Sequence, residues 1–170
     1  WLAHPYWSSV STIRDVLPLR DLAGLEVFNT TCHRNARGES SVHWNDWMEQ
    51  TGRLVPALAT DDAHAAEADQ HDTYGGWTMV RVRQRDADSI RAALEQGLCY
   101  STTGPRIDSI ELRRQPDDDR GQRAITATVR CSEAQAIQAI YDVVGTLWRR
   151  GGQTFEEATF ALAPHARWVR

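Results

Sequence analysis

The sequence contains no lysine, only three cysteines and no long apolar run. All of its basic side chains except the histidines are arginines, and the formal net charge is -4. It therefore lacks the clustered positive charge with which proteins bind nucleic acids. No stretch reaches the roughly 18 apolar residues that a membrane-spanning helix needs. We expect neither a nucleic-acid partner nor a membrane.

The three cysteines, Cys32, Cys99 and Cys131, lie far apart and form no Cys-x-x-Cys pair. This spacing argues against a disulfide framework or a structural zinc site. It indicates reduced thiols, as in a cytoplasmic protein. No signal peptide is visible. The reduced thiols lead us to expect a cytoplasmic location.

What the sequence does contain, over its first hundred residues, is an alternation of strand-like and helix-like segments. With 41% hydrophobic residues, the chain can bury a core. Alternation of this kind is typical of an α/β layer or barrel with a mostly parallel sheet. The expected strands cover residues 1–5, 24–29, 54–59, 77–82 and 98–101, and the expected helices cover residues 10–17, 40–50 and about 87–96. In the helix over residues 40–50 we expect Val42, Trp47 and Met48 on the buried side and a stop at Gly52.

The pattern changes after Gly104-Pro105, where apolar and polar residues begin to alternate with period two. This period holds for Ile110 and Leu112, for residues 125–131 and 137–141, and for Phe160 and Leu162, with no helical segment between them. Period-two alternation predicts antiparallel strands with one buried face. We therefore place a domain boundary between residues 1–105 and an antiparallel β subdomain at 106–170, and we expect the chain to be cut within that subdomain.

Two polar motifs stand directly after predicted strands. Asp62-Ala63-His64 follows the apolar run that ends at Ala59, and His4-Pro5 ends the first strand. Side chains at the carboxyl ends of strands meet at one edge of an α/β sheet. A carboxylate and two imidazoles suit zinc, manganese or iron. Helix capping by Asp61 or Asp62, and a buried structural role for His4, remain the alternatives.

These motifs belong to an ordered set that resembles a known family. The set is Ala3-His4-Pro5, Gly24-Leu25-Glu26-Val27-Phe28-Asn29, Ala59-Thr60-Asp61-Asp62-Ala63-His64, Gly76-Trp77 and Tyr100-Ser101-Thr102-Thr103-Gly104-Pro105. In this order it resembles the later half of the PHP (polymerase and histidinol phosphatase) superfamily of metal-dependent phosphoesterases, in particular the branch related to carbaryl hydrolase. The resemblance covers roughly residues 1–110.

The resemblance implies a distorted (β/α)7 barrel that holds divalent metal ions at the carboxyl ends of its strands. It implies that His4, Asp62 and His64 are metal ligands for zinc, manganese or iron. It further implies that Asp61 orients a ligand, and that Glu26 and Asn29 shape the site. The substrate would be a small phosphate ester or related ester, which metal-bound hydroxide would attack.

The sequence departs from the family in one respect: the family's early His-x-His motif occurs nowhere in it. We therefore expect the chain to be the C-terminal portion of such a domain, without the N-terminal metal motifs, and catalytic only if the missing half is present. One alternative is a non-catalytic, degenerate PHP-like binding module, in which the β subdomain recognises a partner. Another is a plain structural fragment.

Other polar clusters give weaker signals. Cys32, His33 and His43 match no strong metal-binding spacing. His71-Asp72 reads as a solvated loop after the Asp-x-His motif, although it could approach a substrate. The alternating arginines Arg81, Arg83 and Arg85 predict a solvent-facing strand edge rather than a phosphate site, because charged edges discourage aggregation.

Overall fold

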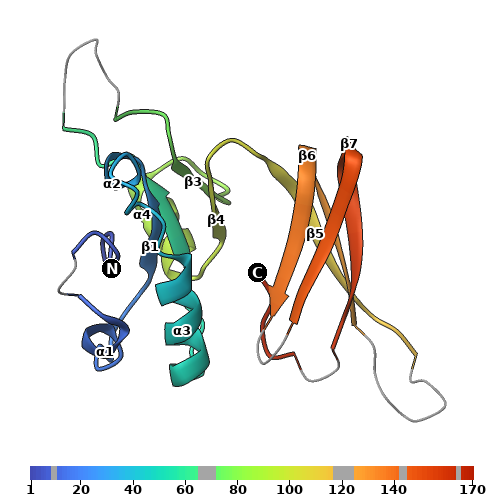
Figure 1. Cartoon of the computed structure of the whole chain (residues 1–170), viewed down its shortest axis with the longest axis horizontal. Helices are drawn as coiled ribbons and strands as arrows, with labels where there is room; N and C mark the ends of the chain where they lie inside the picture. Colours follow the sequence, from blue (N-terminus) through green and yellow to red (C-terminus); the bar gives the residue numbers. More distant parts are fainter. Residues whose placement is uncertain (9–10, 65–71, 117–124, 142–144, 164–165) are drawn as a thin grey trace. The chain divides into compact units, whose positions relative to one another are not determined.

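The computed structural model describes residues 1–8, 11–64, 72–116, 125–141, 145–163 and 166–170. The chain divides into two compact units, Trp1–Gly104 and Pro105–Arg170 (Figure 1). The division falls one residue before the boundary that the change from mixed to period-two patterning predicts. Each unit has its own sheets, so each is described by itself.

The first unit has a mixed α/β fold, as predicted. Its helices are α1 (Ile13–Val16), α2 (Thr30–His33), α3 (Ser41–Thr51) and α4 (Ala87–Glu95). Its strands are β1 (Leu25–Asn29), β2 (Ala57–Thr60), β3 (Trp77–Val80) and β4 (Cys99–Thr102). None of the helices in the described part of the chain is long and apolar enough to cross a membrane.

The strands β1 and β2 form a parallel pair, which the segment around Leu2 extends. Leu25 pairs with Ala57 and Asn29 pairs with Thr60, while Leu2 bridges Leu25 in the same direction. Leu25 and Asn29 of this pair are fully buried, and Glu26 and Ala59 are at most 7% exposed. Because the three segments are parallel, the residues that follow them meet at one edge.

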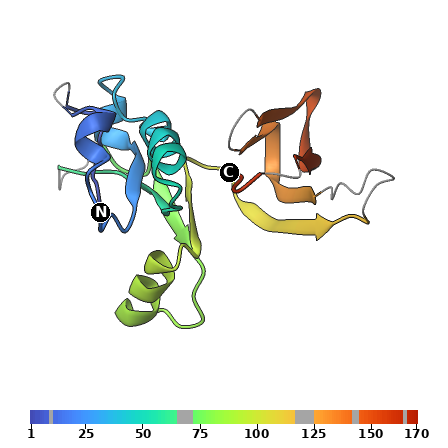
Figure 2. The ribbon, with the colours of Figure 1, turned by 90° about the horizontal axis from the view of Figure 1, so that it is seen from below.

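The strands β3 and β4 are antiparallel, so the expectation of a mostly parallel sheet holds only for β1 and β2. The reason lies in the connection. The backbone N–H of Arg81 donates to the carbonyl of Leu98, so the chain leaves β3 and returns beside it as a hairpin. Figure 2 shows α4 at the far end of this hairpin, where it does not cross over a sheet face.

The helix α3 carries the largest buried side chain of the first unit. Trp47 is fully buried and Met48 is 3% exposed, as predicted. The prediction that Val42 shares this buried side is wrong, because Val42 in the first turn is 66% exposed. Gly52 ends the helix in the left-handed conformation, with φ of 67°, which confirms the predicted stop.

Within the described residues of the first unit, the two sheets are separate and do not close into a barrel. The sheets are joined through side chains rather than a backbone ladder. Thr78 of β3 accepts from the amide of Ala59 at 3.0 Å and donates to its carbonyl at 2.9 Å. Ser101 of β4 donates to the carbonyl of Ala57 at 2.9 Å. These hydroxyls bind backbone N–H and C=O groups of β2 that would pair with a neighbouring strand in a continuous sheet.

The second unit is the predicted antiparallel β unit. Its strands are β5 (Ile107–Arg114), β6 (Ile125–Tyr141) and β7 (Gly145–Leu162), in the order β5-β6-β7. Register shifts between Arg130 and Ala136 interrupt the pairing of β6 with β7. The core lies on one face of this sheet, with buried residues Ala127, Ala139, Ala158, Phe160 and Leu162.

Candidate functional site

The site begins where the parallel segments end. The backbone N–H of His4 donates to the Glu26 carboxylate at 2.6 Å, and Glu26 is only 7% exposed. The hydroxyl of Thr60, the last residue of β2, donates to the other oxygen of the same carboxylate. Glu26, the second residue of β1, thus ties the end of the Leu2 segment to the end of β2, and its charge is stabilised by donors on both of its oxygens.

Asn29 links Glu26 to Asp62. Its side-chain amide donates to Glu26 at 3.2 Å and to Asp62 Oδ2 at 3.1 Å, and its carbonyl oxygen accepts from the backbone N–H of Cys32 at 2.9 Å. Asn29 is fully buried, so the orientation of its amide is fixed by these three bonds. Two carboxylates are therefore held on one amide group.

His64 lies beside Asp62 and a second carboxylate, that of Asp72. The distance from His64 Nε2 to Asp62 Oδ1 is 3.9 Å, and from His64 Nδ1 to Asp72 Oδ2 it is 3.8 Å. The backbone N–H of His64 also donates to Asp72 Oδ2 at 2.7 Å. Asp72 is largely buried, whereas the His64 side chain is 67% exposed. Asp72 therefore fixes the position of a histidine that remains open to solvent.

The sequence interpretation gave Asp72 only a marginal role, because it stands eight residues beyond His64 in a polar stretch without periodicity. No spacing rule links the two positions. A polar residue next to a candidate ligand loop is the one signal that could have drawn attention to it. Its neighbour His71 lies outside the described residues.

Asp61 has a different role from Asp62. Its carboxylate accepts the backbone N–H groups of Tyr74, Gly75 and Gly76 at 2.6, 2.9 and 3.1 Å, and the Thr30 hydroxyl at 2.8 Å. Burial opposes its ionisation, but these four donors outweigh burial and hold the pKa of Asp61 below its usual value. Asp61 therefore anchors the loop that carries Asp72.

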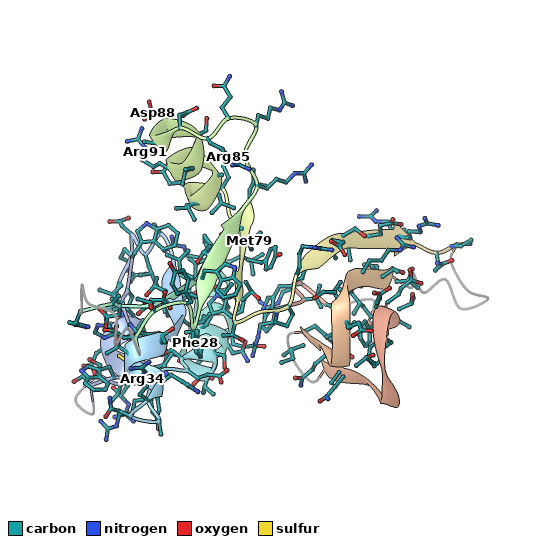
Figure 3. The ribbon with its side chains drawn as sticks, turned by 90° about the horizontal axis from the view of Figure 1, so that it is seen from above. Phe28, Arg34, Met79, Arg85, Asp88 and Arg91 are labelled. Carbon is teal, nitrogen blue, oxygen red and sulfur yellow. The ribbon has the colours of Figure 1, made fainter. Side chains whose placement is uncertain are left out.

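The two glycines in that loop are required by close packing. A Cβ on Gly76 would lie 2.5 Å from Cδ1 of Phe28, and one on Gly75 would clash with the side chain of Thr30. The loop can therefore reach Asp61 only where its backbone carries no side chain. Figure 3 labels Phe28, the β1 residue over which this turn packs.

Two of the predicted ligands have unusual backbone conformations. Four non-glycine residues have positive φ in the described chain, and two of them are His4, at 26°, and Asp62, at 51°. A third is Tyr74, at 59°, whose N–H binds Asp61. Such conformations cost about 1–3 kcal/mol each and concentrate at functional sites.

The predicted site residues thus form one connected network. It runs from His4 through Glu26 and Asn29 to Asp62 and His64, with Asp61 supporting the adjacent loop. Within the described residues, no three His, Cys, Asp or Glu side chains lie close enough together to hold a metal ion. The donor types nevertheless fit a divalent ion. Ligand atoms on one zinc ion lie roughly 3.4 Å apart, given Zn–N and Zn–O distances of about 2.1 Å, and His64 and Asp62 approach this separation.

The remaining sequence candidates are dispersed. The His33 ring lies 5.0 Å from the Phe28 ring, the His43 ring 5.8 Å from the Tyr6 ring, and Cys32 is buried. Arg81, Arg83 and Arg85 follow the end of β3 and are exposed in the connection to α4. Figure 3 labels Arg85 in this connection and the Asp88–Arg91 ion pair of α4, which spans 3.2 Å.

An open pocket of about 400 Å³ lies beside the turn that follows His4. Tyr6 lines it and His43 faces it from α3, while Arg37 lines it and donates to the carbonyl of Trp7 at 3.2 Å. The backbone N–H of Tyr6 donates to the buried Ser40 hydroxyl at 3.2 Å. The His4 turn is therefore fixed against the start of α3, with the pocket between them.

Comparison of the chain with protein-family models, with curated proteins and with solved structures finds no match in any of the three. The functional argument therefore depends on the site itself and on the family resemblance of the sequence motifs.

Proposed function

We propose that the first unit is part of a metal-dependent hydrolase of phosphate esters or related esters, in which His4, Asp62 and His64 hold a divalent ion. One observation carries the proposal. Two of the three proposed ligands, His4 and Asp62, have positive φ, and one network of buried polar side chains joins their segments at the carboxyl ends of parallel strands.

The parallel arrangement supports the barrel part of the proposal. The Leu2 segment, β1 and β2 run in one direction with their polar residues at one edge, which is where α/β barrels place their active sites. We propose that these segments belong to a distorted (β/α)7 barrel of the PHP type. The Leu2 segment, β1 and β2 are then its parallel portion.

Each residue of the network has a distinct part in this proposal. Asn29 orients the ligand Asp62, and Asp72 orients the ligand His64, as amide and carboxylate partners of metal ligands commonly do. Glu26 fixes the backbone of His4. A bound divalent ion supplies an activated water molecule and neutralises charge on the ester.

A second candidate function is a non-catalytic binding module. The observation that favours it is that the sequence contains no His-x-His motif, which the family uses for its first metal ligands. A site of two or three ligands could hold a single ion without supporting hydrolysis. Metal binding and ester hydrolysis therefore have to be measured separately.

The test is titration of the full chain with Zn²⁺ and with Mn²⁺ by calorimetry, together with hydrolysis of 4-nitrophenyl phosphate. We expect His64→Ala to weaken metal binding at least about tenfold, because outer-shell changes alone have effects of this size. His64 is exposed, so its loss leaves packing intact. The matched control is His33→Ala, an exposed histidine outside the network, which should leave binding unchanged.

The outcomes bear on the two candidates differently. Metal binding that depends on His64, with hydrolysis, supports the hydrolase and excludes the non-catalytic module. Metal binding that depends on His64, without hydrolysis, supports the metal site but fits both the binding module and a hydrolase portion that needs the N-terminal metal motifs for catalysis. Equal effects of His64→Ala and His33→Ala, or no binding of either ion, would refute a metal site at these residues.

A further inference from the structure

The strand β5 forms one edge of the sheet in the second unit. In the order β5-β6-β7 its inner side pairs with β6, and no strand among the described residues pairs with its outer side. Backbone N–H and C=O groups along such an edge are free to pair with another strand. Ile110 and Leu112 on this strand are 58% and 60% exposed.

These two side chains lie on the core face of the sheet. Ile110 pairs with Val129 and Leu112 pairs with Ala127, and directly paired residues of antiparallel strands share a face. Ala127 in turn pairs with Phe160, and both are buried in the core. The apolar face thus continues from β7 across β6 to β5, where it becomes exposed.

We propose that β5 pairs antiparallel with β5 of a second copy of this chain, so that two sheets join into one. A two-fold axis perpendicular to the sheet keeps the apolar side chains of both copies on one face. Because side chains alternate between the two faces along a strand, opposed residues then share a face only if their numbers are both even or both odd. Edge pairing of this kind is a common mode of association.

One register matches both the apolar and the charged residues of β5. With Glu111 on the axis, Ile110 of each copy lies opposite Leu112 of the other. Asp108, which lies at the register irregularity between Ile107 and Ser109 and binds Arg106 at 2.6 Å, then lies opposite Arg114. Each side of the apolar centre is thus flanked by one Asp108 carboxylate facing an arginine of the other copy. This arrangement follows from the order of residues in β5, Ile-Asp-Ser-Ile-Glu-Leu-Arg-Arg.

The neighbouring registers match less well. With Ile110 on the axis, Asp108 would face Leu112, which places a charge against an apolar side chain. With Leu112 on the axis, Ile110 would face Arg114. Charge complementarity and apolar matching together therefore favour the register centred on Glu111.

Glu111 of one chain lies opposite Glu111 of the other, on the face of the sheet away from Ile110 and Leu112. Arg113 contacts its carboxylate at 2.9 Å and Arg130 contacts it at 3.0 Å, so two guanidinium groups offset the like charges. Loss of a matched charge at position 108 or 114 should weaken the dimer.

The decisive experiment is cysteine cross-linking of the full chain. Two Cα atoms directly opposite on paired strands lie about 4.5–5.5 Å apart, which is within reach of a disulfide. We expect Glu111→Cys to form a covalent dimer on mild oxidation. Ser109→Cys should not, because in this register Ser109 lies opposite Arg113. The unmodified chain, with Cys32 and Cys131 buried, is the background control.

A charge exchange tests the same register without oxidation. Sedimentation equilibrium should show a shift toward monomer for Asp108→Arg, and recovery of the dimer when Arg114→Asp is added. Both side chains are exposed, so the variants should fold. A chain that is monomeric at all concentrations, or equal cross-linking of Glu111→Cys and Ser109→Cys, would overturn the proposal.

Discussion

Two adjacent aspartates after β2 illustrate how one residue step changes the role of a side chain. Asp61 receives three backbone N–H groups and one hydroxyl, whereas Asp62, with a positive φ, receives the amide of Asn29 and faces His64. The left-handed conformation of Asp62 turns its side chain away from the direction that an extended strand would give it. Asp61 therefore stabilises the loop, while Asp62 is available as a ligand.

At this scale we predict the effect of removing the Asp61 carboxylate. Asp61→Ala leaves three backbone N–H groups without their acceptor and should lower the free energy of unfolding by about 2–3 kcal/mol. Asp61→Asn keeps the oxygen that receives Gly75, Gly76 and Thr30, so its cost should be smaller, about 1 kcal/mol. Urea denaturation followed by tryptophan fluorescence measures both; equal losses would contradict the assignment.

The same carboxylate predicts a pH dependence. Its pKa is lower in the folded than in the unfolded chain, so the folded state favours the charged form. Its contribution is fully present above about pH 5 and is lost as the pH falls below the ordinary value of about 3.9 and through the folded value. Between pH 5 and pH 3, the free energy of unfolding of Asp61→Asn should therefore fall less than that of the unmodified chain, as urea denaturation at each pH measures.

Local residue types predicted much of the network but not all of it. Asp62, His64 and His4 were recognisable because they follow apolar strands. The bond from the His4 backbone to Glu26 and the bond from the Asn29 amide to Asp62 follow from parallel strand order. Asp72 was not, since its contact with His64 depends on the path of a loop. The positive φ values of His4 and Asp62 also could not be predicted from residue type, because histidine and aspartate occur at both signs of φ.

At the scale of single elements, α3 shows which features periodicity captures. The apolar spacing identified Trp47 and Met48, which are buried, but it also assigned Val42, which lies in the first turn and lines the open pocket beside Tyr6. Hydrophobicity alone cannot tell a buried position from a pocket wall. The same limit applies to β3 and β4, whose direction is set by the hairpin at Arg81 and Leu98 rather than by their composition.

The end of α3 gives a prediction about an element boundary. Gly52 has φ of 67°, and its N–H donates to the carbonyl of Met48 at 2.9 Å. A Cβ in this conformation costs about 1 kcal/mol, so Gly52→Ala should lower the free energy of unfolding by about that amount. Gly52→Asn should cost clearly less, because asparagine tolerates the left-handed region. Urea midpoints of the two variants compare them directly; equal losses would argue against a conformational origin.

At the scale of the whole molecule, the two units differ in how they are built. The first depends on parallel strands joined by buried polar side chains, and the second on an antiparallel sheet with an apolar face. The change of patterning near residue 105 predicted this contrast, because period-two alternation and mixed strand–helix patterning are local properties. Closure of a barrel is not local, since it depends on pairings between distant strands.

This construction predicts that the two units unfold separately. Cys32, 2% exposed, lies in the first unit and Cys131, 7% exposed, lies in the second, so each thiol becomes reactive only when its own unit opens. Burial also raises the pKa of both thiols, which lowers their reactivity in the folded state. Thiol labelling at increasing urea, with mass spectrometry to identify the labelled cysteine, therefore reports on each unit independently.

Two variants test this separation. Phe160→Ala removes a core ring of the second unit, 5% exposed, and should destabilise that unit by about 3–5 kcal/mol. It should bring the labelling of Cys131 to lower urea and leave that of Cys32 unchanged, whereas Gly52→Ala should shift only Cys32. If either variant shifts both thiols equally, the two units unfold as one cooperative structure, and the boundary at Gly104 separates two halves of one folding domain.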